Sequence, residues 1–270
     1  MSTKKIVLSG MLLSAALLLC ACNNPSKEEN KEKTKQNSVA LVESTIEKFG
    51  NKSKDVQKFK ADINATNSVD VKGQLSETKQ SLNVEVDFKD KEIHLLNKSD
   101  DKNKDKDNVP ATDMYVKDNK MYLNAYGKWM TSELDPALDV FSEAADIQGL
   151  TGVYNEVKGL KKDLKLVEKD KVVTLETKNL KDIELDQVTL ESIIGADNSK
   201  KDVKVKTYTV KLDLDKNTYL PKTLERNVSV EADGVTYNSK AITKYTDFSD
   251  FDIVVPEEAL KATDAIAEAQ

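Results

Sequence analysis

The sequence predicts an α+β protein built on a curved antiparallel β-sheet, and three features of the chain support this prediction. Long stretches alternate between apolar and polar residues, which is typical of antiparallel strands with one buried face. Asp233-Gly234, between two such stretches, is a strong signal for a two-residue hairpin turn. In the stretch 203–214 the apolar residues shift from odd to even positions, which predicts a β-bulge that bends the sheet.

The N-terminus has the order of a secretory signal peptide. Lys4 and Lys5 precede an apolar stretch, Ile6–Leu19, which is shorter than the about 20 residues that a transmembrane helix needs. The apolar stretch ends in Leu19-Cys20-Ala21-Cys22. A large aliphatic residue, a small residue and then a cysteine resemble the lipobox of bacterial lipoproteins.

The lipobox resemblance implies that residues 1–21 are removed and that Cys22 carries a diacylglycerol and an N-acyl chain such as palmitate. Cys22 fits better than Cys20, because Ala21 supplies the small residue before the cut. An ordinary cleaved signal with a chance cysteine is the alternative. A disulfide between two such close cysteines would be strained, and a metal site would need further ligands nearby. We expect a lipid-anchored protein on the extracytoplasmic face of the cell membrane.

Residues 23–37 contain only polar and charged residues plus Pro25. Such a segment buries too little apolar area to offset its ordering entropy, so residues 22–37 are predicted to be the lipidated cysteine and a disordered tether. The net charge of −6 becomes −8 once residues 1–21, with their two lysines, are removed. This negative charge argues against nucleic-acid binding, and it leaves membrane attachment to the acyl chains.

A single domain is predicted over residues 38–256. It begins with a helix from Ser38 to about Phe49, because apolar residues there recur at helical spacing and Gly50-Asn51 gives a stop. A polar loop is expected over residues 98–108. Alternating segments follow the helix at 59–71, 82–88, 93–97, 114–116 and 121–123, and Trp129 ends this part of the chain.

The middle of the chain is helical in period. Asp135-Pro136 is a typical helix start, and apolar stripes then predict helices through 138–147, 153–160 and 180–194. Two short alternating runs between 164 and 178 predict a hairpin between the second and third of these helices. The remaining expected elements are strands at 203–214, 220–232 and 235–247, and a loosely helical C-terminal tail, residues 257–270, after Pro256.

Three phrases, together with the lipobox and the order of the elements, resemble Gram-positive lipoproteins related to the LolA and LppX carriers. They are DMYVKDNKMYLNAYGKWMTSEL (Asp113–Leu134), LPKTLERNVSVEADG (Leu220–Gly234) and FDIVVPEEAL (Phe251–Leu260). The resemblance implies a strongly curved, unclosed half-barrel with helices packed on its concave side. It also implies a non-catalytic extracellular binder, carrier or sensor that holds an apolar, lipid-like ligand between sheet and helices.

The candidate ligand-binding residues are the large apolar side chains of the hairpin and of the helical stripes. The same residues would form an ordinary filled core if no gap exists. In that case the domain is a surface interaction or scaffold module that binds a protein or an envelope polymer. The candidates are Met114, Met121, Trp129, Leu138, Phe141, Val153, Tyr154 and Val157.

The chain offers little catalytic chemistry. His94 is the only histidine, and its place between Ile93 and Leu95 in a strand puts it on the polar face without an obvious partner. One histidine and one acylated cysteine cannot form the usual nucleophilic triads. An enzyme would instead need a cleft with convergent carboxylates of perturbed pKa. We expect no enzyme activity, no cofactor and a monomer.

The loop 98–108 begins like a calcium-binding EF-hand loop, with acidic or amide residues at alternate positions from Asp101 to Asp107. Lys106 then occupies the position of the required glycine, and Thr112 that of the bidentate glutamate. The interleaved lysines also offset the negative charge. We interpret the segment as a solvated connection between strands, with no metal site.

Overall fold

The computed structural model describes residues 27–101, 112–125, 127–134, 149–181, 183–185, 190, 193–194 and 202–264, and only the backbone of 27–38 and 98–101. The chain divides into two compact units, Met1–Gln36 and Asn37–Gln270, and the second unit contains the sheet. The predicted helix through 138–147 lies outside the described residues, as do most of the loop 98–108 and Cys22.

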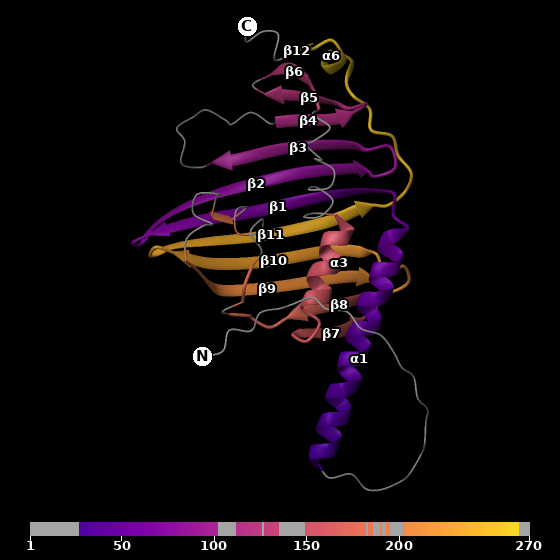
Figure 1. Ribbon diagram of the computed structural model, residues 1–270, viewed down its shortest axis with the longest axis vertical. Helices are drawn as coiled ribbons and strands as arrows, with labels where there is room; N and C mark the ends of the chain where they lie inside the picture. Colours follow the sequence, from indigo (N-terminus) through magenta and orange to yellow (C-terminus); the bar gives the residue numbers. More distant parts are fainter. Residues whose placement is uncertain are drawn as a thin grey trace. The chain divides into compact units, whose positions relative to one another are not determined.

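One open sheet forms the framework of the second unit (Figure 1). The described strands have the order β12-β6-β5-β4-β3-β2-β1-β11-β10-β9-β8-β7. Every pair is antiparallel except β12 and β6, which run parallel. The strands are β1 (Lys58–Val71), β2 (Gln74–Asp87), β3 (Glu92–Asp101), β4 (Thr112–Lys117), β5 (Lys120–Ala125), β6 (Lys128–Glu133), β7 (Leu164–Lys169), β8 (Val172–Thr177), β9 (Val203–Asp215), β10 (Pro221–Ala232), β11 (Val235–Asp247) and β12 (Thr263–Asp264).

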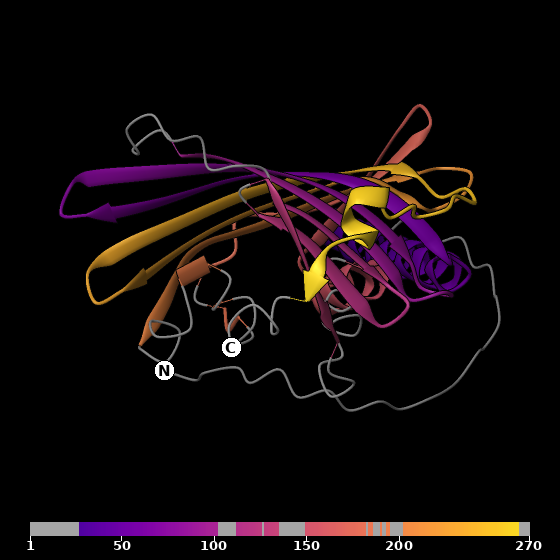
Figure 2. The same cartoon turned by 90° about the horizontal axis from the view of Figure 1, so that it is seen from above.

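The predicted turn and bulge are both confirmed. Asp233 and Gly234 link β10 to β11 with φ angles of 53° and 76°, as a two-residue hairpin of the primed type requires. In β9 the pairing with β10 shifts between Ser229 and Val230, so that Lys206 is the extra residue. The buried residues change from odd to even positions at this bulge, and Figure 2 shows the strong twist of the sheet.

Three helices are described: α1 (Lys27–Lys54), α3 (Leu150–Gly159) and α6 (Glu257–Leu260). α3 corresponds to the predicted helix 153–160, and α6 to the start of the predicted helical tail. The prediction of a helix over 180–194 is wrong at its beginning, because Leu180 forms a β-bridge with Tyr208 and residues 181 and 183–185 are not helical. Backbone pairing with β9 here replaces the helical hydrogen bonds that the apolar spacing suggested.

α1 is longer at both ends than the sequence predicts. It begins at Lys27, inside the segment predicted to be a coiled tether, and it continues past Gly50 to Lys54. The Lys- and Glu-rich segment before Ser38 has a high helix propensity. The helix that packs on the sheet after Ser38 can therefore extend backwards through this segment. Gly50 does not end the helix. Instead, the absence of a side chain at Gly50 allows the ring of Tyr154 to pack closely against α1. A Cβ there would lie 2.3 Å from Cε2 of Tyr154.

We expect Gly50→Ala to destabilise the domain by about 1–3 kcal/mol, because the added methyl group overpacks the contact with Tyr154. The helix propensity of alanine would otherwise stabilise the helix by up to about 1 kcal/mol. Gly159→Ala is the matched control, since a Cβ at this helical glycine meets nothing within 4 Å. Urea unfolding measures both changes, and a Gly50→Ala variant as stable as Gly159→Ala would contradict the close contact.

The two faces of the sheet carry separate hydrophobic clusters. The first cluster joins α1 and α3 to the face that we call the inner face, through residues such as Phe49, Val153 and Ala61. The second cluster lies on the opposite, outer face, since Tyr115 belongs to it while its strand neighbour Val116 belongs to the first. The outer cluster comprises Tyr115, Ile253, Val255 and Ala259, with Tyr122, Trp129 and Phe251 packed against it.

The segment 248–256, which we call the C-terminal strap, connects β11 to α6 and contributes three residues to the outer cluster. Two lysines of the sheet hold its backbone. Lys58 donates to the carbonyl of Phe251 at 2.7 Å, and Lys117 donates to the carbonyl of Ile253 at 2.9 Å. Ile253 is 1% exposed and Val254 is 73% exposed, so alternate residues of the strap face the sheet.

Asp87 anchors the same region from the end of β2. Its carboxylate accepts hydrogen bonds from the backbone N–H groups of Lys89 and Asp90, and it pairs with Lys58 at 3.0 Å. Burial alone would raise the pKa of Asp87, but these N–H groups and the Lys58 ammonium outweigh it and hold the pKa below its ordinary value. Folding is therefore stabilised by ionised Asp87.

We expect acidification to remove this contribution. A group with a lowered pKa in the folded state stabilises above its unfolded pKa, about 4 for Asp, and its contribution is lost as the pH falls through the folded pKa. Asp87→Asn should make the free energy of unfolding less dependent on pH between about pH 5 and pH 3. Asp90→Asn, at an exposed neighbour, is the control. Parallel pH curves for wild type and Asp87→Asn would contradict the role of this carboxylate.

Candidate functional site

The candidate site is an apolar row on the inner face of the sheet. The strand register pairs Leu95 of β3 with Met114 of β4, Met114 with Leu123 of β5, and Leu123 with Met130 of β6. Directly paired residues point to the same face, so these four side chains stand side by side across four strands. All four are only partly buried, unlike the fully buried core beneath α1 and α3.

A second row runs beside the first. It pairs Ile93 with Val116 and Val116 with Met121, and both Ile93 and Val116 are 1% exposed. Met121 is partly buried, like the members of the first row. The inner face of β3 to β6 therefore includes three methionines, whose unbranched thioether side chains adapt to ligands of varied shape.

A polar network lies on the same face, between α3 and the far half of the sheet. Arg226 of β10 donates from Nε and Nη2 to the carboxylate of Glu156 in α3, with the shortest distance 2.6 Å. The hydroxyl of Tyr208 donates to Oε1 of the same carboxylate at 2.6 Å. The side chains of Arg226 and Glu156 are only 20% and 14% exposed. The pair is thus a largely desolvated, bidentate ion pair.

Burial and ion pairing shift the pKa values of two groups in and near this network. Burial opposes the charge of Arg226, but the adjacent Glu156 carboxylate outweighs it and raises the pKa of Arg226. Nearby, burial raises the pKa of Tyr245 to about 12, with a smaller opposing effect from Arg226. The Arg226 guanidinium therefore stays charged and the Tyr245 hydroxyl stays protonated at neutral pH.

The structure brings only some of the predicted ligand-binding residues together. Met114 and Met121 share the inner face of neighbouring strands. Val153 and Val157 are 0% exposed in the helix–sheet core, so they are covered by protein in this structure. Tyr154 packs edge-on against Phe49, with ring centroids 6.3 Å apart. The remaining helical candidates, Leu138 and Phe141, lie outside the described residues.

The placement of Trp129 on the ligand-facing side needs correction. Trp129 is paired with Asn124, belongs to the outer cluster, and its ring lies 6.0 Å from that of Tyr115. The strand alternation of the short β6 puts Met130, not Trp129, on the inner face. The sequence around Trp129 has no clear alternation of apolar and polar residues, so the face of the sheet on which Trp129 lies could not be predicted.

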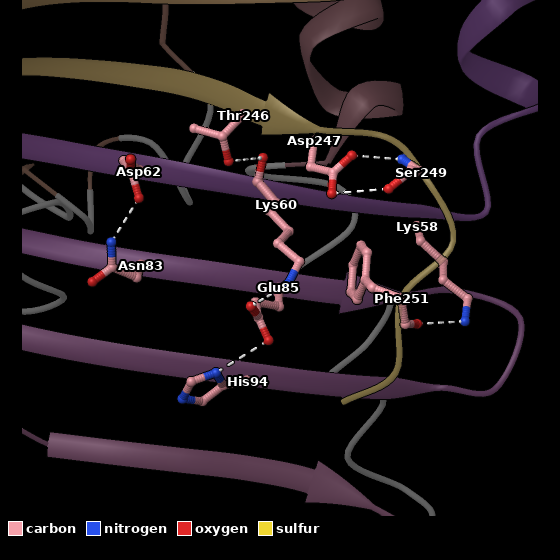
Figure 3. Close-up of polar contacts among 10 residues, drawn as sticks. All are labelled: Lys58, Lys60, Asp62, Asn83, Glu85, His94, Thr246, Asp247, Ser249 and Phe251. Atoms are coloured by element: carbon pink, nitrogen blue, oxygen red, sulfur yellow. Dashed lines mark hydrogen bonds and ion pairs between the residues drawn. The ribbon is translucent and has the colours of Figure 1, made fainter. Parts of the chain in front are cut away.

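The interpretation of His94 is right about its face and wrong about its partners. His94 lies on the outer face, where Nδ1 is 3.4 Å from Oε2 of Glu85 (Figure 3). Its Nε2 is 2.8 Å from Oδ1 of Asp113. Its ring stacks on Tyr115 at 4.1 Å. Glu85 also pairs with Lys60, whose ammonium lies over the ring of Phe251 in the strap. The register between neighbouring strands creates these contacts, which the local sequence does not reveal.

The sequence analysis also missed Arg226, although a signal was available. It is the only arginine of the chain and shares the even positions of β10 with the buried residues Leu224 and Val228. A charged residue in the apolar phase of a strand needs a buried partner. Which residue supplies that partner could not be read from the strand alone.

The described part of the chain has no cluster of three or more His, Cys, Asp or Glu residues that could hold a metal ion. None of its helices is both long enough and apolar enough to cross a membrane. The arrangement that it does contain, a partly buried apolar row on the inner face of the sheet, is suited to holding an apolar molecule by burial.

The open antiparallel sheet with helices packed on its inner face is the architecture that the sequence predicts. The family model described as "Family of unknown function (DUF6612)" matches residues 41–264, and the chain belongs to this family. No curated protein matches the chain.

Solved structures with a similar fold include three lipoprotein-related chains. LprF from Mycobacterium bovis is 10% identical over 82% of this chain and 98% of its own, with a TM-score of 0.44. LppX from Mycobacterium tuberculosis is 9% identical over 80% and 99%, with a TM-score of 0.40. A putative outer membrane lipoprotein-sorting protein domain from Vibrio parahaemolyticus is 10% identical over 82% and 97%, with a TM-score of 0.26.

Proposed function

We propose that this protein is a lipid-anchored, extracytoplasmic lipoprotein that binds an apolar, lipid-like ligand and catalyses no reaction. Cys22 carries the anchor, and the ligand lies along the inner-face row Leu95, Met114, Leu123 and Met130. The partial exposure of this row is the observation that supports the proposal most directly. Burial of an acyl chain there would supply about 0.8 kcal/mol per methylene group removed from water.

The binding of a hydrocarbon fluorophore tests the proposal. We expect diphenylhexatriene to become fluorescent on the mature chain, residues 22–270, produced without its acyl groups. Leu123→Lys should weaken this binding by about tenfold or more, because it places a charge in the row and removes an apolar contact. Asn124→Lys is the matched control, since the next residue of the same strand points to the outer face.

Two results would contradict the proposal. One is a wild-type chain that does not bind the fluorophore, which would favour a filled core and a scaffold role. The other is equal loss of binding in Leu123→Lys and Asn124→Lys, which would place the bound probe away from the inner face. Circular dichroism of both variants shows whether the fold is retained.

A further inference from the structure

The inner-face row continues beyond its methionines to a tyrosine. Leu95 is paired with Val84 of β2, Val84 with Ala61 of β1, and Ala61 with Tyr245 of β11. The row therefore crosses seven adjacent strands, from Tyr245 at one end to Met130 at the other. At about 4.8 Å between strands its length is about 29 Å, enough for an extended long-chain molecule.

The Tyr245 hydroxyl is a buried polar group without a partner. Tyr245 is 8% exposed, and its hydroxyl has no hydrogen-bond partner in the described structure. Its ring is held between Phe59 and Phe248, at centroid distances of 5.9 and 6.0 Å. Buried hydroxyls in native proteins are nearly always hydrogen-bonded, so an orphan of this kind indicates that something else supplies the acceptor.

The charges around Tyr245 indicate which acceptor fits. Arg226 and Glu156 both act on Tyr245 electrostatically, but each already neutralises the other through a bidentate pair. Among the described residues, neither of these two charges is left uncompensated, so a carboxylate placed here would be costly to desolvate. An uncharged oxygen needs no counter-charge and accepts the hydroxyl proton directly.

We propose that Tyr245 donates a hydrogen bond to an uncharged oxygen of the ligand, such as an ester carbonyl, so that the ligand is a neutral amphiphile. Its apolar chain extends from Tyr245 toward Met130 along the row. Ala61 and Val84 are 2% and 6% exposed, so binding at Tyr245 requires the core packed over these two residues to move aside. This inference rests on the proposed function, because it assigns one end of the same site.

Tyr245→Phe tests the inference without removing any hydrogen bond between described residues. The probes are diphenylhexatriene, which has no oxygen, and the methyl ester of dansylaminoundecanoic acid, both titrated into the mature chain. We expect Tyr245→Phe to weaken binding of the ester about 5- to 10-fold, as for one lost hydrogen bond, and to leave diphenylhexatriene unchanged. Tyr237→Phe, on the same face of β11, should change neither affinity.

The outcomes separate this inference from the proposed function. If wild type binds both probes and Tyr245→Phe binds the ester equally well, the Tyr245 site is wrong while the apolar row stands. If wild type binds neither probe, the proposed function itself fails. The free dansyl acid should bind more weakly than its ester, and tighter binding of the acid would overturn the choice of an uncharged head. Urea unfolding of Tyr245→Phe should show no loss of stability.

Discussion

Cys22→Ala is expected to release the protein from the cell membrane into the surrounding medium. In the lipoprotein that we propose, two or more acyl chains give stable anchoring, and the apolar stretch before Cys22 is removed with the signal peptide. The remaining chain has a net charge that disfavours adsorption to anionic lipid. Fractionation of cells into membrane and medium, followed by immunoblotting, measures the change, which should be close to complete.

Cys20→Ala is the matched control for anchoring, because it changes the only other cysteine of the chain. If Cys20→Ala releases the protein and Cys22→Ala does not, the cleavage site is misassigned. If both variants stay in the membrane fraction after residues 1–21 have been removed, the anchor is not an acylated cysteine. Mass spectrometry of the N-terminal peptide from the wild type identifies the first mature residue directly.

Glu156→Ala should cause a large loss of stability, about 3–5 kcal/mol, because it leaves the Arg226 guanidinium buried without a counter-charge. It also removes the acceptor of the Tyr208 hydroxyl. The double variant Glu156→Leu/Arg226→Leu should recover much of this loss, since it removes both charges together. Urea unfolding at pH 7 measures the free energies.

The ion pair between Glu43 and Lys161 provides the control for Glu156. Its two side chains are 43% and 44% exposed, and the pair is 2.8 Å long. Glu43→Ala should change stability by no more than about 1 kcal/mol, because exposed pairs contribute little. A Glu156→Ala variant as stable as Glu43→Ala would show that water reaches the Arg226 network freely.

Strand identity and local bends could be predicted because their signals are local. The alternation in β1, the Asp233-Gly234 turn and the bulge at Lys206 each depend on residues within a few positions of one another. Steric preferences and the burial of alternate side chains act at this range. The helix stripe of α3 is predictable for the same reason.

The failures have a common physical cause. The helix expected from Leu180 and the stop expected at Gly50 were decided by distant partners, Tyr208 and Tyr154. Tertiary packing and β-pairing outweigh local propensity, which is worth only about 1 kcal/mol per residue. The partners of His94 were missed because they lie on neighbouring strands whose register is not encoded locally.

The sequence by itself determined the strands, their apolar phase, the signal-like N-terminus and the likeness to a half-barrel lipoprotein. Only the tertiary structure decided which side chains meet. Glu156 and Arg226 are 70 positions apart in the sequence, and Ala61 of the first strand pairs with Tyr245 of β11, close to the C-terminal end of the sequence. Side-chain periodicity is a property of one strand, whereas the row from Tyr245 to Met130 exists only when seven strands pair in one register.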